Sequence, residues 1–214
     1  MSIKSPALLA ASCLLSVALA SAVALHNPKT ALAAADTAPA YTSSGEMRPP
    51  AGYREWIYLT TGIDMSYAVK PPGMQDHSMF DNVFVNPEAY RSFQATGTWP
   101  DKTVMVLEAR EARSKGSINQ HGHFQAGGVM DLEVHVKDES RFPGKWAFFS
   151  FDSTSANGTL IPPAAACYTC HAAHAAVDTT FVQFYPTLLP IAQEKRTLSE
   201  AFLKEEAATG AAKQ

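Results

Sequence analysis

The sequence contains little cysteine and no run of basic residues. Of its three cysteines, Cys13 lies in an apolar leader, so a mature chain keeps only Cys167 and Cys170 and cannot be a scaffold held by several disulfides. Lysine and arginine number 17 against 20 aspartates and glutamates, which gives a formal net charge of -3. Because DNA and RNA bind basic surfaces, this balance argues against a nucleic-acid partner. Hydrophobic residues make up 46% of the 214 positions, enough for the core of one domain.

The first 25 residues are typical of a targeting segment. Lys4 supplies a positive charge, and residues 7–25 are apolar with many small side chains, as in secretory signal peptides. Two short stretches of small residues, which end at Ala20 and at Ala35, are suitable cleavage sites for a signal peptidase. The length of the apolar run also allows an uncleaved N-terminal anchor helix. We therefore expect a periplasmic or secreted protein, either released from this segment or anchored by it.

Composition divides the remainder of the chain into three parts. Residues 26–50 are rich in Ala, Thr, Ser and Pro and poor in large apolar side chains, which predicts a disordered linker. Residues 51–204 carry the periodic patterns and are predicted to form the domain. Residues 205–214, EEAATGAAKQ, are polar or small and are predicted to be a flexible tail.

Apolar and polar residues alternate with period two in several parts of this domain, which predicts half-buried strands over 53–61, 82–85, 103–110, 129–136 and 145–151. Turn signals separate them at 71–73, 97–101, 127–128 and 143–144. A short helix is expected from Pro87 to Phe93 with Asn86 as its N-cap, another beginning near Pro163, and a third over 198–206. The sequence therefore predicts an α+β fold, a mostly antiparallel sheet with helices at its ends.

Residues 167–171 read CYTCH, the attachment signature of c-type haem. Cys167 and Cys170 lie about one helical turn apart, so their thiols can form thioethers with the two vinyl groups on one porphyrin edge, and His171 can then bind the iron. Zinc binding, a thioredoxin-like redox pair and a structural disulfide remain as alternatives. The close spacing disfavours the first, the preceding LIPPAAA disfavours the second, and strain disfavours the third.

Other residues in the sequence are weaker candidates for a haem site. His174 follows His171 at helical spacing, and His121 and His123 form an HGH pair without a nearby cysteine or carboxylate. A sixth iron ligand, if there is one, could come from a methionine, and the candidates are Met65, Met74, Met79, Met105 and Met130. Candidates to anchor the haem propionates are Arg54, Arg91 and Arg141.

The segment CYTCHAAHAAVDTTFVQFYPTLLP resembles the cytochrome P460 family. Three upstream blocks carry the same resemblance, so that it runs from Gly52 to Leu189: GYREWIYL, VFVNPEAYRSFQATGTWPDKTVMVLEAR and LEVHVKDESRFPGKWAFFSF. The resemblance implies a β-rich haem protein of the periplasm, usually a homodimer. It also implies one of two activities, because some members oxidise hydroxylamine and carry a lysine cross-linked to the haem, whereas the cytochromes c prime beta lack that lysine and bind nitric oxide or carbon monoxide.

Leu107 indicates which branch this chain resembles, and Glu133 and Phe80 are further candidates for the distal side of the haem. In an approximate alignment Leu107 stands at the place of the cross-link lysine, and Lys102, at odd spacing from it, would point to the other face of a strand. Glu133 matches a glutamate that the resemblance implies as a distal proton relay, although an outward-facing strand carboxylate is equally compatible with the pattern. Phe80 is the candidate for an aromatic cap over the distal pocket.

The sequence thus predicts an exported cytochrome with one covalently attached haem c, its iron bound by His171 and otherwise open to nitric oxide or a similar small ligand. Two alternatives stay open, a hydroxylamine-oxidising enzyme and a periplasmic electron carrier, so enzymatic activity is undecided. The expected partners are a small ligand, namely nitric oxide, carbon monoxide or hydroxylamine, a small periplasmic redox protein, and a second copy of the chain in a homodimer.

Overall fold

The computed structural model describes residues 37–65, 78–152 and 156–212. In these ranges the chain forms a six-stranded antiparallel sheet whose strands follow one another in sequence order. The strands are β1 (Ile57–Ile63), β2 (Met79–Val85), β3 (Val104–Arg113), β4 (Phe124–Lys137), β5 (Trp146–Phe151) and β6 (Thr159–Leu160). Strands that are consecutive in the sequence usually lie next to each other in a sheet, which accounts for this order even where helix α1 (Pro87–Thr96) connects β2 to β3.

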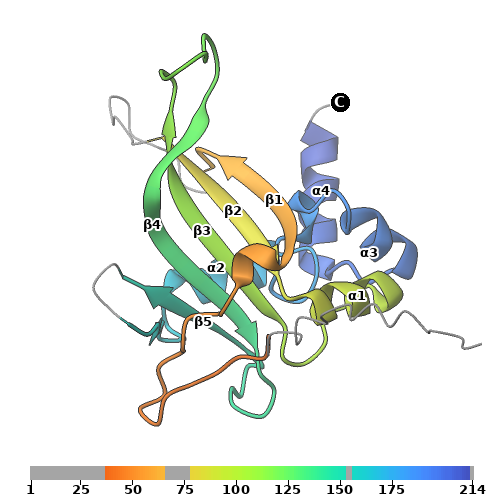
Figure 1. Cartoon of the computed structure of the whole chain (residues 1–214). Helices are drawn as coiled ribbons and strands as arrows, with labels where there is room; N and C mark the ends of the chain where they lie inside the picture. Colours follow the sequence, from red (N-terminus) through yellow and green to blue (C-terminus); the bar gives the residue numbers. More distant parts are fainter. Residues whose placement is uncertain (1–36, 66–77, 153–155, 213–214) are drawn as a thin grey trace, which may run out of the picture. The chain divides into compact units, whose positions relative to one another are not determined.

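The helices follow or interrupt the strands, which confirms the predicted α+β fold. They are α1 (Pro87–Thr96), α2 (Ala166–His174), α3 (Leu189–Lys195) and α4 (Glu200–Ala212), with 3-10 turns η1 (Tyr53–Glu55) and η2 (Val182–Phe184). Figure 1 shows α1, α3 and α4 grouped to one side of the strands, while α2 lies against the sheet.

Helix α1 begins where the sequence predicts it. Asn86 occupies the N-cap and Pro87 the first position, but the Asn86 side chain does not cap the helix. Its amide donates to the Lys102 carbonyl at 3.2 Å, and its oxygen accepts the Val104 N–H at 2.9 Å. Asn86 therefore joins the start of the helix to the start of β3.

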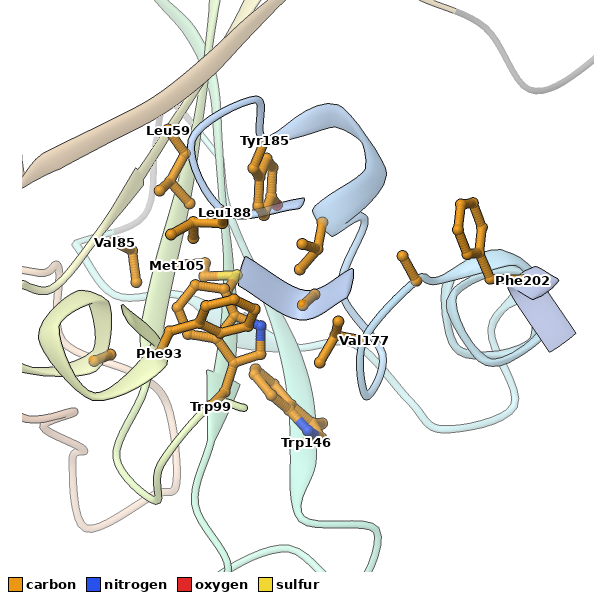
Figure 2. Close-up of a cluster of buried hydrophobic side chains, with 14 residues drawn as sticks. Leu59, Val85, Phe93, Trp99, Met105, Trp146, Val177, Tyr185, Leu188 and Phe202 are labelled. Atoms are coloured by element: carbon orange, nitrogen blue, oxygen red, sulfur yellow. The ribbon is translucent and has the colours of Figure 1, made fainter. Parts of the chain in front are cut away.

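One face of the sheet packs against the helices. Figure 2 shows Phe93, Trp99 and Met105 gathered in this core, where the rings of Phe93 and Trp99 are 4.3 Å apart. The Trp99 indole donates to the Thr180 hydroxyl at 2.7 Å, so the turn after α1 is held to the segment that follows α2. This core fixes the position of the late helical region relative to the strands.

The other face of the sheet is covered by the segment that precedes β1, which corrects the prediction of a disordered linker reaching Pro50. Met47 is 1% exposed and packs with Trp56 in a second core cluster. Its backbone exchanges two hydrogen bonds with Gly158, at 2.9 and 2.7 Å. A single methionine and a tyrosine, Tyr41, supply the apolar contacts in a stretch whose composition otherwise indicates disorder.

Two further differences concern elements of the domain. Gly127 and Gly128, predicted as a turn, lie inside β4, where the pairing with β3 shifts between Ala126 and Val129 and forms a bulge. Glycine marks bulges as well as turns, and Gly127 has a φ of 69°. Helix α4 extends to Ala212, so residues 205–212 continue a helix, whereas the sequence analysis ended this helix at Glu206 and expected a flexible tail.

Candidate functional site

Helix α2 carries the whole CYTCH segment. Cys167 and Cys170 are half-buried and their thiols are free, so they are not joined by a disulfide. Tyr168, between them, donates its hydroxyl proton to the Ile161 carbonyl at 3.0 Å and accepts the Phe148 N–H at 3.2 Å. These bonds hold the start of α2 against β5 and leave both thiols available for covalent chemistry.

The His171 side chain lies between α2 and the sheet. Its Nδ1 donates to the Thr179 carbonyl at 2.7 Å, and this bond fixes the tautomer, because a carbonyl can only accept. Burial lowers the pKa of His171, and the bond to Thr179 only partly opposes that shift. His171 is therefore neutral, with an unprotonated Nε2 that can bind a metal ion.

A cavity of about 230 Å³ opens between His171 and the strands. Its floor is a row of directly paired residues, Thr60, Val83, Leu107 and Glu133, on β1 to β4. Residues paired across an antiparallel sheet point to the same face, which explains why these four converge. Leu107 and Glu133, both singled out from the sequence, thus lie side by side on the cavity wall.

Aromatic rings form much of the remaining wall. Phe181 and Phe184 come from the segment that follows the CYTCH helix, and Phe148 comes from β5. The His171 ring is 4.2 Å from Phe181 and 4.6 Å from Phe148. An apolar cavity beside a neutral histidine and two free thiols fits a haem group, whose flat ring is apolar and whose iron accepts an imidazole nitrogen.

Two carboxylates line the same cavity. Glu133 opens onto it, yet the surrounding protein is dense enough that desolvation raises the pKa of Glu133, and the charges of Asp131 and Asp81 raise it further. Burial likewise raises the pKa of Asp81, with Asp131 and Asp64 adding to the shift. Glu133 thus lines the cavity while its side chain remains exposed through the opening, and it can hold a proton at higher pH than an ordinary glutamate.

The expectation that Phe80 caps the cavity is wrong. Phe80 lies in β2 between Met79 and Asp81, and it pairs with Ile63 and Arg110. Because Asp81 lines the cavity and neighbouring residues of a strand point to opposite faces, the Phe80 side chain lies on the face of the sheet opposite the cavity. The aromatic residues of the cavity come instead from the FVQF segment.

The weaker candidates fall mostly outside the cavity. His174 pairs with Glu205 at 2.9 Å, and His121 and His123 are exposed. Among the methionines, Met65 and Met105 line the cavity, Met79 and Met130 do not, and Met74 lies outside the described residues.

The basic residues weighed from the sequence also lie elsewhere. Arg54 pairs with Glu108, Arg91 pairs with Glu88, and Arg141 stacks over Tyr41, so none of the three lines the cavity. Lys102 donates to Asp138, and like the arginines it does not line the cavity.

His135 also lines the cavity, although it was not among the residues predicted from the sequence. It is 8% exposed, and burial together with the neighbouring His171 lowers its pKa well below the ordinary value. The signal was present in the LEVHVKD block, since His135 follows Glu133 by two residues and must share its face. In the residues that the structure describes, no three His, Cys, Asp or Glu side chains converge as ligands of a metal ion.

The family model for cytochrome P460 matches residues 50–182. The chain belongs to the cytochrome P460 family. The matched range includes the strands that line the cavity and the helix with the two cysteines, and family membership implies that the protein binds haem, as in a c-type cytochrome. The comparison with curated proteins gave no match. Within the described ranges, none of the helices combines the length and the apolar character needed to cross a membrane.

Proposed function

We propose that this cytochrome P460 protein is exported, carries one covalently attached haem c, and binds nitric oxide or a similar small ligand. Cys167 and Cys170 would hold the haem through thioethers, and His171 would bind its iron through Nε2. The bound haem would supply an iron site that small diatomic molecules can occupy. This assignment is supported by the free thiols on α2 and by the bond between His171 Nδ1 and the Thr179 carbonyl.

The observation that carries the ligand-binding role is the position of Leu107 on the cavity wall. In the resemblance described above, the hydroxylamine-oxidising members have a lysine at this place. Leucine cannot form a bond to the porphyrin or to iron, and neither Leu107 nor Val83, which pairs with it, offers a hydrogen bond to a polar ligand. This apolar part of the wall suits a small neutral ligand.

Absorption spectra of the purified protein, alone and titrated with nitric oxide, test this proposal. We expect high-spin spectra before the ligand is added and a single binding transition afterwards. The variants Met65→Leu and Met105→Leu serve as controls, because these methionines line the cavity. A low-spin resting spectrum that becomes high-spin in either variant would show a methionine ligand and would favour the electron carrier.

Glu133 favours one alternative function, the oxidation of hydroxylamine. Removal of two electrons from hydroxylamine gives nitroxyl and releases two protons, and a carboxylate of raised pKa beside the substrate can accept one of them. An assay of hydroxylamine with an added one-electron acceptor dye separates the two functions. Steady turnover that is lost in Glu133→Gln and kept in Asp81→Asn would favour the enzyme, whereas no turnover supports a ligand-binding protein.

Export and assembly complete the proposal. The apolar leader supports a periplasmic or secreted location, and the family resemblance supports a homodimer and a small redox partner. Cell fractionation tests the first proposal, and light scattering of the haem-loaded protein tests the homodimer. Protein confined to the cytoplasm, or a monomer at micromolar concentration, would contradict the respective expectation.

A further inference from the structure

His135 is a buried histidine without an assigned role in the proposed function. It lies in β4 and pairs with Phe148 of β5, and the two rings stack at 4.0 Å with an interplanar angle of 9°. Trp146 contacts the ring at 4.4 Å, and the His171 ring lies 5.1 Å away at 75°. The His135 ring is thus enclosed by aromatic neighbours directly behind the proposed iron ligand.

Thr179 connects the two histidines. Its hydroxyl lies 3.2 Å from His135 Nε2, and its carbonyl accepts the His171 Nδ1 proton at 2.7 Å. Both groups belong to one residue, so a contact that holds the hydroxyl also restricts the backbone positions that the carbonyl can take. A buried imidazole costs free energy unless it is hydrogen-bonded, and the Thr179 hydroxyl supplies that bond.

We infer that His135 is a positioning residue that acts through Thr179 to orient His171 and to set the electron donation of His171 to the iron. This inference rests on the proposed function, because it requires His171 to be the haem ligand. His135 holds the Thr179 hydroxyl, and the Thr179 carbonyl is then aimed at Nδ1 of His171. The alternative is a purely structural role, in which His135 only fills the space between Phe148 and Trp146.

The direction of the effect follows from the hydrogen bond at Nδ1. A strong bond from Nδ1–H to a carbonyl raises the basicity of the imidazole, and a more basic ligand stabilises ferric over ferrous iron. If the contact between His135 and the Thr179 hydroxyl is lost, the hydrogen bond from His171 Nδ1 to the Thr179 carbonyl weakens. The midpoint potential should then become more positive, and the iron–histidine stretching frequency of the ferrous protein should fall.

Three variants of the full, haem-loaded protein test the inference. His135→Phe keeps a planar ring between Phe148 and Trp146 but removes the nitrogen that contacts Thr179. Thr179→Val removes the hydroxyl and keeps the carbonyl, whereas Thr179→Ser keeps both groups. We expect His135→Phe and Thr179→Val to shift the potential and the stretching frequency in the stated directions, and Thr179→Ser to match the wild type.

The double variant His135→Phe/Thr179→Val should shift the potential no more than either single variant, because all three break the same contact. A wild-type potential and stretching frequency in folded, haem-loaded His135→Phe would overturn the inference. Should that variant fail to fold, unchanged values in Thr179→Val would overturn it equally. If the wild type itself lacks covalent haem or an iron–histidine band, the proposed function fails, which is a different result from unchanged variants of a haem-loaded protein.

Discussion

Glu108 follows Leu107 in β3 but points to the opposite face of the sheet, where it meets three partners. Its side chain is 4% exposed and accepts hydrogen bonds from Tyr53, Arg54 and Arg110. Burial alone would raise the pKa of Glu108, but these bonds outweigh it and lower the pKa below its ordinary value of 4.5. Burial and the bond to Glu108 also raise the pKa of Tyr53 to about 12.

Replacement of Glu108 by Gln should destabilise the protein in a pH-dependent way. Arg54 is 55% exposed and solvent screens its charge, so we expect a loss of about 2 kcal/mol rather than the roughly 3–5 kcal/mol of a fully buried pair. Because the folded pKa is lowered, the stabilisation is present above 4.5 and is lost as the pH falls through the folded pKa. Urea unfolding at neutral and acidic pH measures this, and an equal loss at both would contradict it.

Glu133→Gln should have the opposite effect on stability. The pKa of Glu133 is raised by burial first and by Asp131 and Asp81 next, so its charge opposes folding once the pH exceeds its unfolded pKa. The variant should be at least as stable as the wild type at neutral pH, and the two should converge in acid. The same urea series measures this. A Glu133→Gln variant that is less stable than the wild type at neutral pH would be inconsistent with a raised pKa.

Single positions differ in how far the sequence determines them. Leu107 and Glu133 were proposed from the family resemblance, and the structure places both on the cavity wall, whereas their roles there stay predictions. Phe80 was misassigned because the predicted strand began at 82, which left its face open, and β2 in fact begins at Met79. His135 could have been found by parity, but its contact with Thr179 depends on a turn that no local pattern specifies.

At the scale of elements, backbone conformation at a helix end decides how α1 stops. Gly97 follows the helix with a φ of 75°, and its N–H donates to the Phe93 carbonyl at 2.7 Å. A Cβ built on Gly97 would lie 2.7 Å from the Lys195 Cβ, so α3 leaves no space for a side chain there. Glycine therefore serves both the left-handed turn and the close approach of α3.

Gly97→Ala should be more destabilising than the same change at Gly52. Gly52 also has a positive φ, 63°, but nothing lies within 4 Å of a Cβ built on it. Gly52→Ala should therefore lower the free energy of unfolding by only about 1 kcal/mol, through conformational strain. Gly97→Ala adds a clash and should lose about 2–3 kcal/mol. Thermal unfolding of the two variants compares them directly, and equal losses would show that α3 moves away at little cost.

The existence of most elements could be predicted, because period-two alternation marks strands that are half-buried. Their ends and interruptions could not. Gly127 and Gly128 have the composition of a turn, and only the pairing of β3 with β4 shows that they form a bulge. In the same way, the small residues of 207–212 continue α4, since alanine favours a helix once one has begun.

At the scale of the whole molecule, the sheet needs a cover on both faces. The helices cover the face with the cavity, and residues 41–56 cover the other, with Met47 and Trp56 in its core. Composition alone could not predict this cover, because the described part of residues 26–50 contributes only two large apolar side chains to it, Tyr41 and Met47. The domain therefore begins before Gly52, where the family resemblance begins.

Met47→Ala should destabilise the domain although it lies outside the range that the family model matches. Met47 is 1% exposed, and truncation of a buried methionine costs about 2–5 kcal/mol. Met130→Ala is the matched control, since Met130 is 46% exposed and should change the free energy of unfolding by less than about 0.5 kcal/mol. A loss in Met47→Ala that is as small as the loss in Met130→Ala would mean that the Met47 side chain does not contribute to the core.

The central claim is that Cys167 and Cys170 bind haem covalently and that His171 binds its iron. The most direct test is a pyridine haemochrome spectrum of the exported protein, recorded before and after extraction with acid acetone, for the wild type and for Cys167→Ala/Cys170→Ala. We expect a c-type spectrum and a colour that stays with the wild-type polypeptide, whereas any pigment of the double variant should be extracted. A colourless wild type, or pigment that acid acetone removes from it, would rule out covalent attachment of haem.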